Sequence, residues 1–140
     1  MGYRSEVAYI IRFENKEMRE TFVALQRAKA DAHINEALNE LVEVEDDKLG
    51  FHADHVKWYD SYEGVQAHQT LLREAINLYN DKEDITGYRF IRLGEESEDN
   101  VAEEEGYSDE LYDYVDWYRG TNISFPRNTW EHNQTKGEEA

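Results

Sequence analysis

The side chains best suited to chemistry lie in the segment His52-Ala53-Asp54-His55, which holds two imidazoles and one carboxylate. Imidazole and carboxylate groups bind transition metals when they converge in space. On a strand, His52 and Asp54 would share one face while His55 would point to the other, so only a bend or bulge would gather all three. The segment is a candidate metal site for a metal-dependent enzyme. The alternative interpretation is a set of polar strand residues, some facing solvent.

No other catalytic pattern is present. The acidic residues between Glu95 and Asp99 could attract Ca²⁺, but they lack the alternating acids and the central glycine of an EF-hand loop. The chain contains neither a Gly-x-Ser-x-Gly motif nor a glycine-rich phosphate loop. With 32 acidic residues, any carboxylate pair can be matched to glycoside hydrolysis, so such a match carries no specificity. We therefore predict no catalytic residue, no cofactor and no enzymatic activity.

The charge of the chain is strongly negative and unevenly distributed. Its formal net charge is −17, from 15 basic and 32 acidic residues. Residues 1–94 contain 12 basic and 18 acidic residues, whereas residues 95–116 contain no basic and 11 acidic residues. Direct binding of nucleic acid or of an anionic membrane is disfavoured, because both need Lys and Arg to contact phosphates. A basic protein partner fits the charge better.

Aromatic residues interrupt the second half of this acidic run, between Tyr107 and Tyr118. Carboxylates that steer a partner and aromatics that anchor it suit a surface that docks on a basic protein. A DNA-mimic inhibitor of a nucleic-acid-binding host protein would present such an array. In the alternative interpretation, the aromatics pack inward and the acids face water. The predicted contact residues are Glu103, Glu104, Glu105, Asp109, Glu110, Tyr112, Asp113, Tyr114, Asp116 and Trp117.

A further cluster would form if the first strand lay beside the hairpin that ends in Trp58-Tyr59-Asp60. Arg4 would then pair with Asp60 or stack on Trp58 or Tyr59, as guanidinium groups commonly do. Such a cluster would either fix the end of the sheet or bind a small ligand or peptide.

The elements that would position these residues follow from hydrophobic periodicity. The alternation in residues 5–13, apolar on both faces, predicts a central strand. Asn15 is a predicted helix N-cap. The expected elements are helices over 15–30, 32–41 and 62–80, and strands over 5–13, 42–45, 49–59, 87–93 and part of 115–125.

This β-α-β-β-α-β order predicts an α+β fold, a ferredoxin-like split β-α-β antiparallel sheet with helices on one face and an added C-terminal edge strand. We expect one domain over residues 1–125 and a polar, disordered tail over 126–140. Because such sheets often associate through an open edge, a homodimer that serves as an accessory or structural domain is an alternative function. The absence of cysteine and of any signal-like or membrane-spanning apolar run predicts a soluble, cytoplasmic protein.

Three motifs also resemble those of a known family. They are Gly2-Tyr3-Arg4-Ser5-Glu6-Val7, Lys57-Trp58-Tyr59-Asp60 and Phe90-Ile91-Arg92-Leu93-Gly94-Glu95. Together, in this order, they resemble a family of small, uncharacterised proteins of bacteriophages and bacterial genomes. The resemblance spans about residues 2–125. It implies a phage-encoded protein, acting in the host cytoplasm, and it implies no catalytic residues.

Overall fold

The computed structural model describes residues 2–79, 86–96 and 98–106, together with Leu111 and Val115. None of the helices in this part of the chain combines the length and the apolar character needed to cross a membrane. The elements are, in order, β1 (Ser5–Arg12), α1 (Lys16–Ala28), α2 (Ala32–Glu40), β2 (Val42–Glu45), β3 (Lys48–Val56), α3 (Glu63–Tyr79), β4 (Gly87–Leu93) and β5 (Asn100–Gly106).

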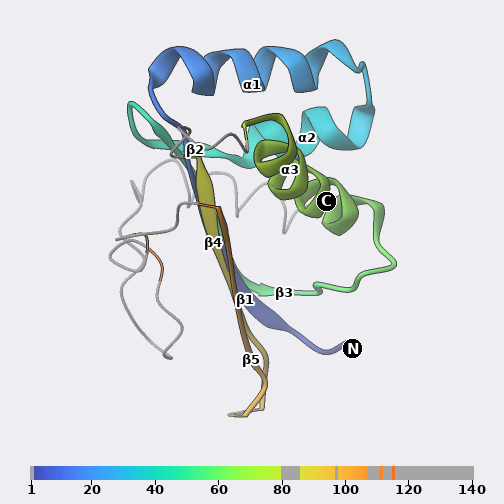
Figure 1. Ribbon diagram of the computed structural model, residues 1–140. Helices are drawn as coiled ribbons and strands as arrows, with labels where there is room; N and C mark the ends of the chain where they lie inside the picture. Colours follow the sequence, from blue (N-terminus) through green and yellow to red (C-terminus); the bar gives the residue numbers. More distant parts are fainter. Residues whose placement is uncertain (1, 80–85, 97, 107–110, 112–114, 116–140) are drawn as a thin grey trace.

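The strands form one antiparallel sheet in the order β2-β3-β1-β4-β5, with the helices on one side of it (Figure 1). β1 lies in the centre, paired with β3 on one side and β4 on the other. The part β2-β3-β1-β4 has the order of a ferredoxin-like sheet, and β5 extends it at one edge. The predicted α+β fold, the central first strand and the added edge strand are therefore confirmed.

The edge strand that the structure describes lies outside the residues predicted to form an edge strand. The prediction placed it within 115–125, of which the structure describes only Val115. The described edge strand is Asn100–Gly106, within the acidic stretch 95–116. Three successive glutamates, Glu103 to Glu105, hide the period-two alternation that marks a strand. Pairing with β4 overrides this low local preference. The expected tail, 126–140, lies outside the described residues.

The helix-covered face of the sheet holds the larger core. Tyr9 and Phe22 are fully buried there and pack with Phe51, Leu71 and Phe90. The helices begin where the sequence predicts. Asn15 Oδ1 accepts a hydrogen bond from the Met18 N–H at 2.9 Å, which confirms the predicted cap of α1.

A polar chain crosses this core. The Tyr9 hydroxyl lies 2.6 Å from His68 Nδ1, and His68 Nε2 lies 3.1 Å from a Glu40 carboxylate oxygen. Burial, and then the nearby Glu40 charge, raises the pKa of Tyr9 well above its ordinary value, so its hydroxyl keeps its proton. The hydroxyl can then donate to Nδ1, while Nε2–H donates to Glu40. Each polar atom of this buried chain therefore has a partner.

The opposite face of the sheet has a smaller core. Ala8, Ile10 and Ile91 are buried there, and they are covered by Leu111 and Val115, each 0% exposed. The Val115 N–H donates to the Leu111 carbonyl at 3.1 Å. Leu111 and Val115, which belong to the acidic-aromatic segment (residues 107–118), therefore pack against the sheet.

Candidate functional site

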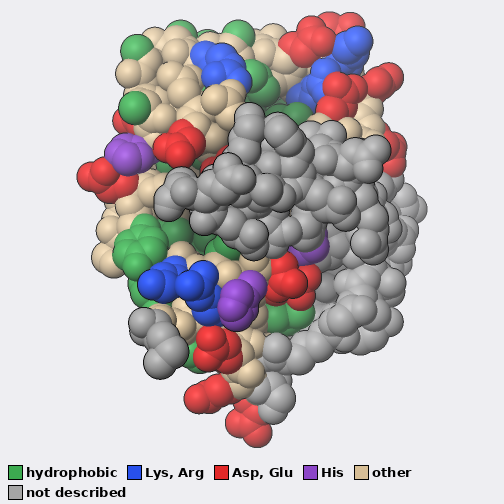
Figure 2. Space-filling view, turned by 180° about the vertical axis from the view of Figure 1, so that it is seen from behind, with side chains coloured by type: hydrophobic (Ala, Val, Ile, Leu, Met, Phe, Trp, Pro, Cys, Tyr) green, Lys and Arg blue, Asp and Glu red, His purple; other side chains and the backbone are tan. Residues whose placement is uncertain are grey.

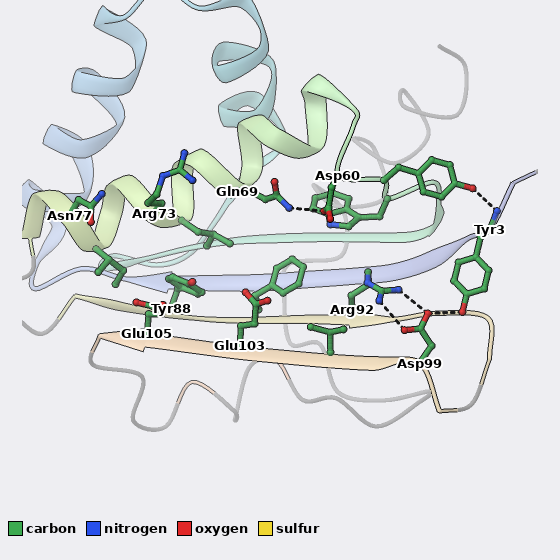
Figure 3. A pocket seen from close by; sticks show the side chains of 16 residues that line it. Tyr3, Asp60, Gln69, Arg73, Asn77, Tyr88, Arg92, Asp99, Glu103 and Glu105 are labelled. Carbon is green, nitrogen blue, oxygen red and sulfur yellow. Dashed lines mark hydrogen bonds and ion pairs between the residues drawn. The ribbon is translucent and has the colours of Figure 1, made fainter.

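A groove of about 800 Å³ lies between α3 and the outer strands β4 and β5 (Figure 3). It exists because the helices cover the inner strands, whereas β5 extends the sheet beyond α3. Tyr88 and Phe90 of β4 and Glu103 and Glu105 of β5 form its strand side, and Arg73 of α3 lies on its helix side. The groove brings residues of α3, β4 and β5 together with the N-terminal residue Tyr3, and it is the candidate site.

Strand register places an acid beside each of the two aromatic residues that β4 contributes to the groove. Tyr88 pairs with Glu105 and Phe90 with Glu103 across β4 and β5. Tyr88 and Phe90 are only 8% and 7% exposed, while both glutamates are exposed. Within the described part of the chain, neither Glu103 nor Glu105 forms an ion pair or a hydrogen bond. The groove thus offers aromatic surface next to uncompensated negative charge, an environment that favours a cation.

Tyr88 is a mostly buried residue that lines the groove and carries a polar hydroxyl group. This hydroxyl forms no hydrogen bond with any residue that the structure describes, although the side chain is more than nine-tenths buried. Burial, reinforced by the charges of Glu105 and Glu103, raises the pKa of Tyr88 from 10.0 to about 12. The hydroxyl is therefore protonated at neutral pH, and it can donate to or accept from a group in the groove.

This raised pKa makes the stability of the protein depend on alkaline pH. A raised pKa means that the folded state holds the proton more tightly, so this stabilisation is complete below pH 10 and is lost as pH rises towards 12. Because Tyr88 lines an open groove, solvent screening keeps its contribution below the roughly 3 kcal/mol that a shift of this size would give in full. We expect Tyr88→Phe to leave stability near neutral pH almost unchanged and to reduce the loss above about pH 10. Denaturant unfolding of both proteins over this range measures the difference, and parallel pH profiles would contradict the assignment.

Tyr3, Arg92 and Asp99 line one end of the groove, close to the N-terminus of the chain. Arg92 binds the Asp99 carboxylate through two nitrogens, at 3.0 and 2.9 Å, and the Tyr3 hydroxyl donates to the same carboxylate at 2.6 Å. The hydrogen bond with Asp99 is the main cause that raises the pKa of Arg92 and also that of Tyr3. A Cβ atom at Gly94 would collide with Asp99 and with the Tyr3 hydroxyl, so this cluster requires glycine there.

Three residues of the predicted aromatic cluster line this groove, and the fourth does not. Trp58, Tyr59 and Asp60 border it, and the Trp58 ring lies 6.2 Å from that of Phe90. The expectation that Arg4 pairs with Asp60 or stacks on its aromatic neighbours is wrong. Arg4 Nη1 instead donates to the carbonyl of His55 at 3.1 Å.

Local hydrogen bonds explain this difference. Asp60 precedes α3, and its carboxylate accepts from Gln69 on that helix at 3.0 Å, so it has a partner close in sequence. The Arg4 N–H donates to the Glu95 carboxylate at 2.9 Å, which holds the first residues against the β4–β5 turn. Tyr3, the residue before Arg4, reaches the groove in its place.

The predicted metal site is not assembled. β3 has a bulge near its end, and His55 adopts a positive φ of 58° there. The bulge does not bring the three side chains together. His52 Nε2 lies 2.8 Å from a carboxylate oxygen of Glu6 on β1, while Asp54 and His55 are exposed. Among the residues that the structure describes, no three His, Asp or Glu side chains converge to hold a metal ion.

The three glutamates predicted to contact a partner occupy different faces of β5. Glu103 and Glu105 face the groove. Glu104 lies on the other face and forms an ion pair with Arg89, which is 7% exposed and also donates to the Val115 carbonyl at 2.7 Å. Further carboxylates form the tip of the molecule where β4 turns into β5 (Figure 2). The other predicted contact residues, Asp109, Glu110, Tyr112, Asp113, Tyr114, Asp116 and Trp117, lie outside the described residues.

Sequence reasoning missed Tyr3, Tyr88, Arg92 and Asp99 as members of this site. One signal was available, since Tyr88, Phe90 and Arg92 alternate on a strand that was predicted correctly. The position of Asp99 had no comparable signal, because its loop conformation depends on contacts with Tyr3 and Arg92. Comparison of the chain with protein-family models, with curated proteins and with solved structures finds no match.

Proposed function

We propose that this chain is a non-enzymatic binding protein that contacts a basic protein partner through the acidic strand β5 and the groove beside it. One observation carries the proposal: Glu103 and Glu105 are exposed and unpaired within the described residues, and they flank the aromatic residues Tyr88 and Phe90.

The chemistry of this surface favours a protonated amine or a guanidinium. Carboxylates attract a cationic group over a distance and speed its encounter, while aromatic faces stabilise it at short range. Because the long-range part of this attraction is screened by ions, the affinity should fall steeply as salt concentration rises. The groove also contains Arg73, and this positive charge on the opposite wall favours a partner with a defined orientation over a diffuse cloud of cations.

The resemblance to phage and bacterial proteins supports a more specific form of this proposal. The chain would be phage-encoded and would bind a nucleic-acid-binding protein of the host cytoplasm, as an inhibitor that mimics DNA. Two features support mimicry: the carboxylates gathered at the β4–β5 tip and the successive glutamates of β5. Together they form a negative array of the kind that a DNA-binding groove accepts.

Affinity capture from a bacterial lysate at low salt tests the proposal. We expect the protein to retain DNA- or RNA-binding proteins, and we expect duplex DNA to release them. Glu103→Lys/Glu105→Lys should abolish the capture, because it reverses the charge of the groove. Glu104 is left unchanged in this variant, since its ion pair with Arg89 supports the fold.

The matched control is Glu14→Lys/Glu36→Lys, which changes the net charge equally at two exposed positions away from β5. The control should capture the same proteins as the unmodified chain. Equal losses in both variants would show that only net charge matters, and they would refute a role for β5. Captured proteins that duplex DNA fails to release would refute DNA mimicry and leave the basic partner in place.

A further inference from the structure

We infer that the basic partner adds an extended strand to the outer edge of β5 and places a Lys or Arg side chain in the groove between α3 and β5. This inference rests on the proposed function and specifies the form of the partner. It combines two observations: β5 is the outer strand of the described sheet, and the mostly buried side chain of Tyr88 lines the groove with a hydroxyl that has no partner among the described residues.

The edge of β5 is available within the described part of the chain. β5 is the last strand of the sheet order and pairs with β4 along its whole length, from Asn100 to Gly106. No other described strand pairs with its second edge. Alternate N–H and C=O groups of an edge strand point outward and can form a new ladder with an extended peptide. Main-chain hydrogen bonds would give this pairing affinity, and side-chain pockets would give it specificity.

Strand alternation determines which residues of the added peptide meet the groove. Residues opposite Glu103 and Glu105 would direct their side chains into it, while residues between them would point to the other face. On that other face Glu104 already forms an ion pair with Arg89, so the peptide residue opposite Glu104 need not be basic. The edge therefore favours a peptide with basic residues at alternating positions over one with the same charge in any order.

The groove provides the contacts that a long cationic side chain needs. The aliphatic stem of Lys or Arg would lie on Tyr88 and Phe90, and its charged end would meet the free carboxylates of Glu103 and Glu105. The Tyr88 side chain lines the groove while only 8% exposed, and its hydroxyl has no partner among the described residues. This hydroxyl would accept a hydrogen bond from the inserted ammonium or guanidinium group, which supplies the partner that it lacks.

A second copy of this chain fits the same edge poorly. Pairing two β5 strands would bring the glutamates of both copies side by side, and like charges opposite one another destabilise a sheet. Carboxylates on an edge strand are a known protection against pairing of identical edges. The same charges favour a basic strand, so the edge selects its partner by charge.

Binding of defined peptides to the whole chain tests the inference. The probe is a peptide of alternating Lys and Thr, long enough to span β5, and its comparison is the same peptide with every backbone nitrogen methylated. Methylation leaves the charge intact but removes the N–H donors that a ladder needs. We expect methylation to weaken binding about tenfold or more, the factor that corresponds to roughly 1.4 kcal/mol. Isothermal titration calorimetry at low salt measures both affinities.

The neutral variant Glu103→Gln/Glu105→Gln should also lose affinity for the unmethylated peptide by about tenfold or more, while Glu14→Gln/Glu36→Gln should keep it. Equal binding of the two peptides would overturn strand addition. The proposed function would survive that result if the β5 variant still lost affinity. Absence of peptide binding would likewise overturn strand addition. The proposed function then depends on the lysate capture, and it fails only if the capture is insensitive to charge reversal on β5.

Discussion

Replacing Leu111 with alanine is expected to lower the free energy of unfolding by about 2–5 kcal/mol, the range measured for leucine removed from a close-packed core. Leu111 is 0% exposed and packs on the sheet face opposite the helices, against Ala8, Ile10 and Ile91. The truncation would leave a cavity between the sheet and the segment that covers it. Urea unfolding followed by circular dichroism or tryptophan fluorescence measures the change.

Leu25→Ala is the matched control, because Leu25 lies on α1 with 46% of its surface exposed. Alanine is at least as good a helix former as leucine, so the control should lose less than about 1 kcal/mol. A loss at Leu111 no larger than that at Leu25 would show that the acidic-aromatic segment is not anchored to the sheet. A large loss would show that Leu111 anchors this segment to the sheet.

The buried pair Tyr9–His68 should give a large and non-additive effect. Tyr9→Phe would leave His68 Nδ1 without a partner, and His68→Leu would leave the Tyr9 hydroxyl without one, at full burial. Each unsatisfied group costs about 1–3 kcal/mol, whereas replacing both partners by apolar groups of similar shape can be nearly neutral. We therefore expect the double variant to lose clearly less stability than the sum of the two single variants. Chemical denaturation of the four proteins completes the double-mutant cycle.

Glu40 provides the internal comparison for this cycle. Its side chain, 40% exposed, is hydrated when His68 is replaced, so Glu40→Gln should cost less than either buried substitution. Additive losses in the Tyr9 and His68 cycle would mean that the two side chains do not act as a pair. The hydrogen bond between them would then add no stability beyond that of side-chain packing.

The sequence predicts the fold well where apolar periodicity is strong. The alternation from Ser5 to Phe13 predicted the central strand, and Asn15 predicted the start of α1, because both signals are local. The edge strand β5 was not predicted, for the opposite reason. Asn100–Gly106 carries three glutamates in succession, and its strand state depends on pairing with β4. Such pairing is a tertiary contact that no local pattern reveals.

The candidate site was predicted only in part. Charge counting identified Glu103 to Glu105, and the aromatic motif identified Trp58 to Asp60, but nothing in the sequence indicated that both border one groove. Their proximity arises from the sheet order, which places β5 beyond the helix layer. The Arg4 prediction failed because a side chain has many partners within reach, and Asp60 found a nearer one in Gln69.

The central position of β1 has a consequence for how the chain folds during synthesis. β1 is made before both of its neighbours, and its pairing with β4 joins Glu6 to Leu93 and Arg12 to Gly87. Until β4 leaves the ribosome, one edge of β1 lacks its strand partner, and the face later covered by Leu111 and Val115 is open. Such non-local pairing is slow, and the waiting strand is prone to aggregate. Nascent chains halted before Gly87 should therefore bind a holdase chaperone through residues 5–12, and chains that extend past Leu93 should release it.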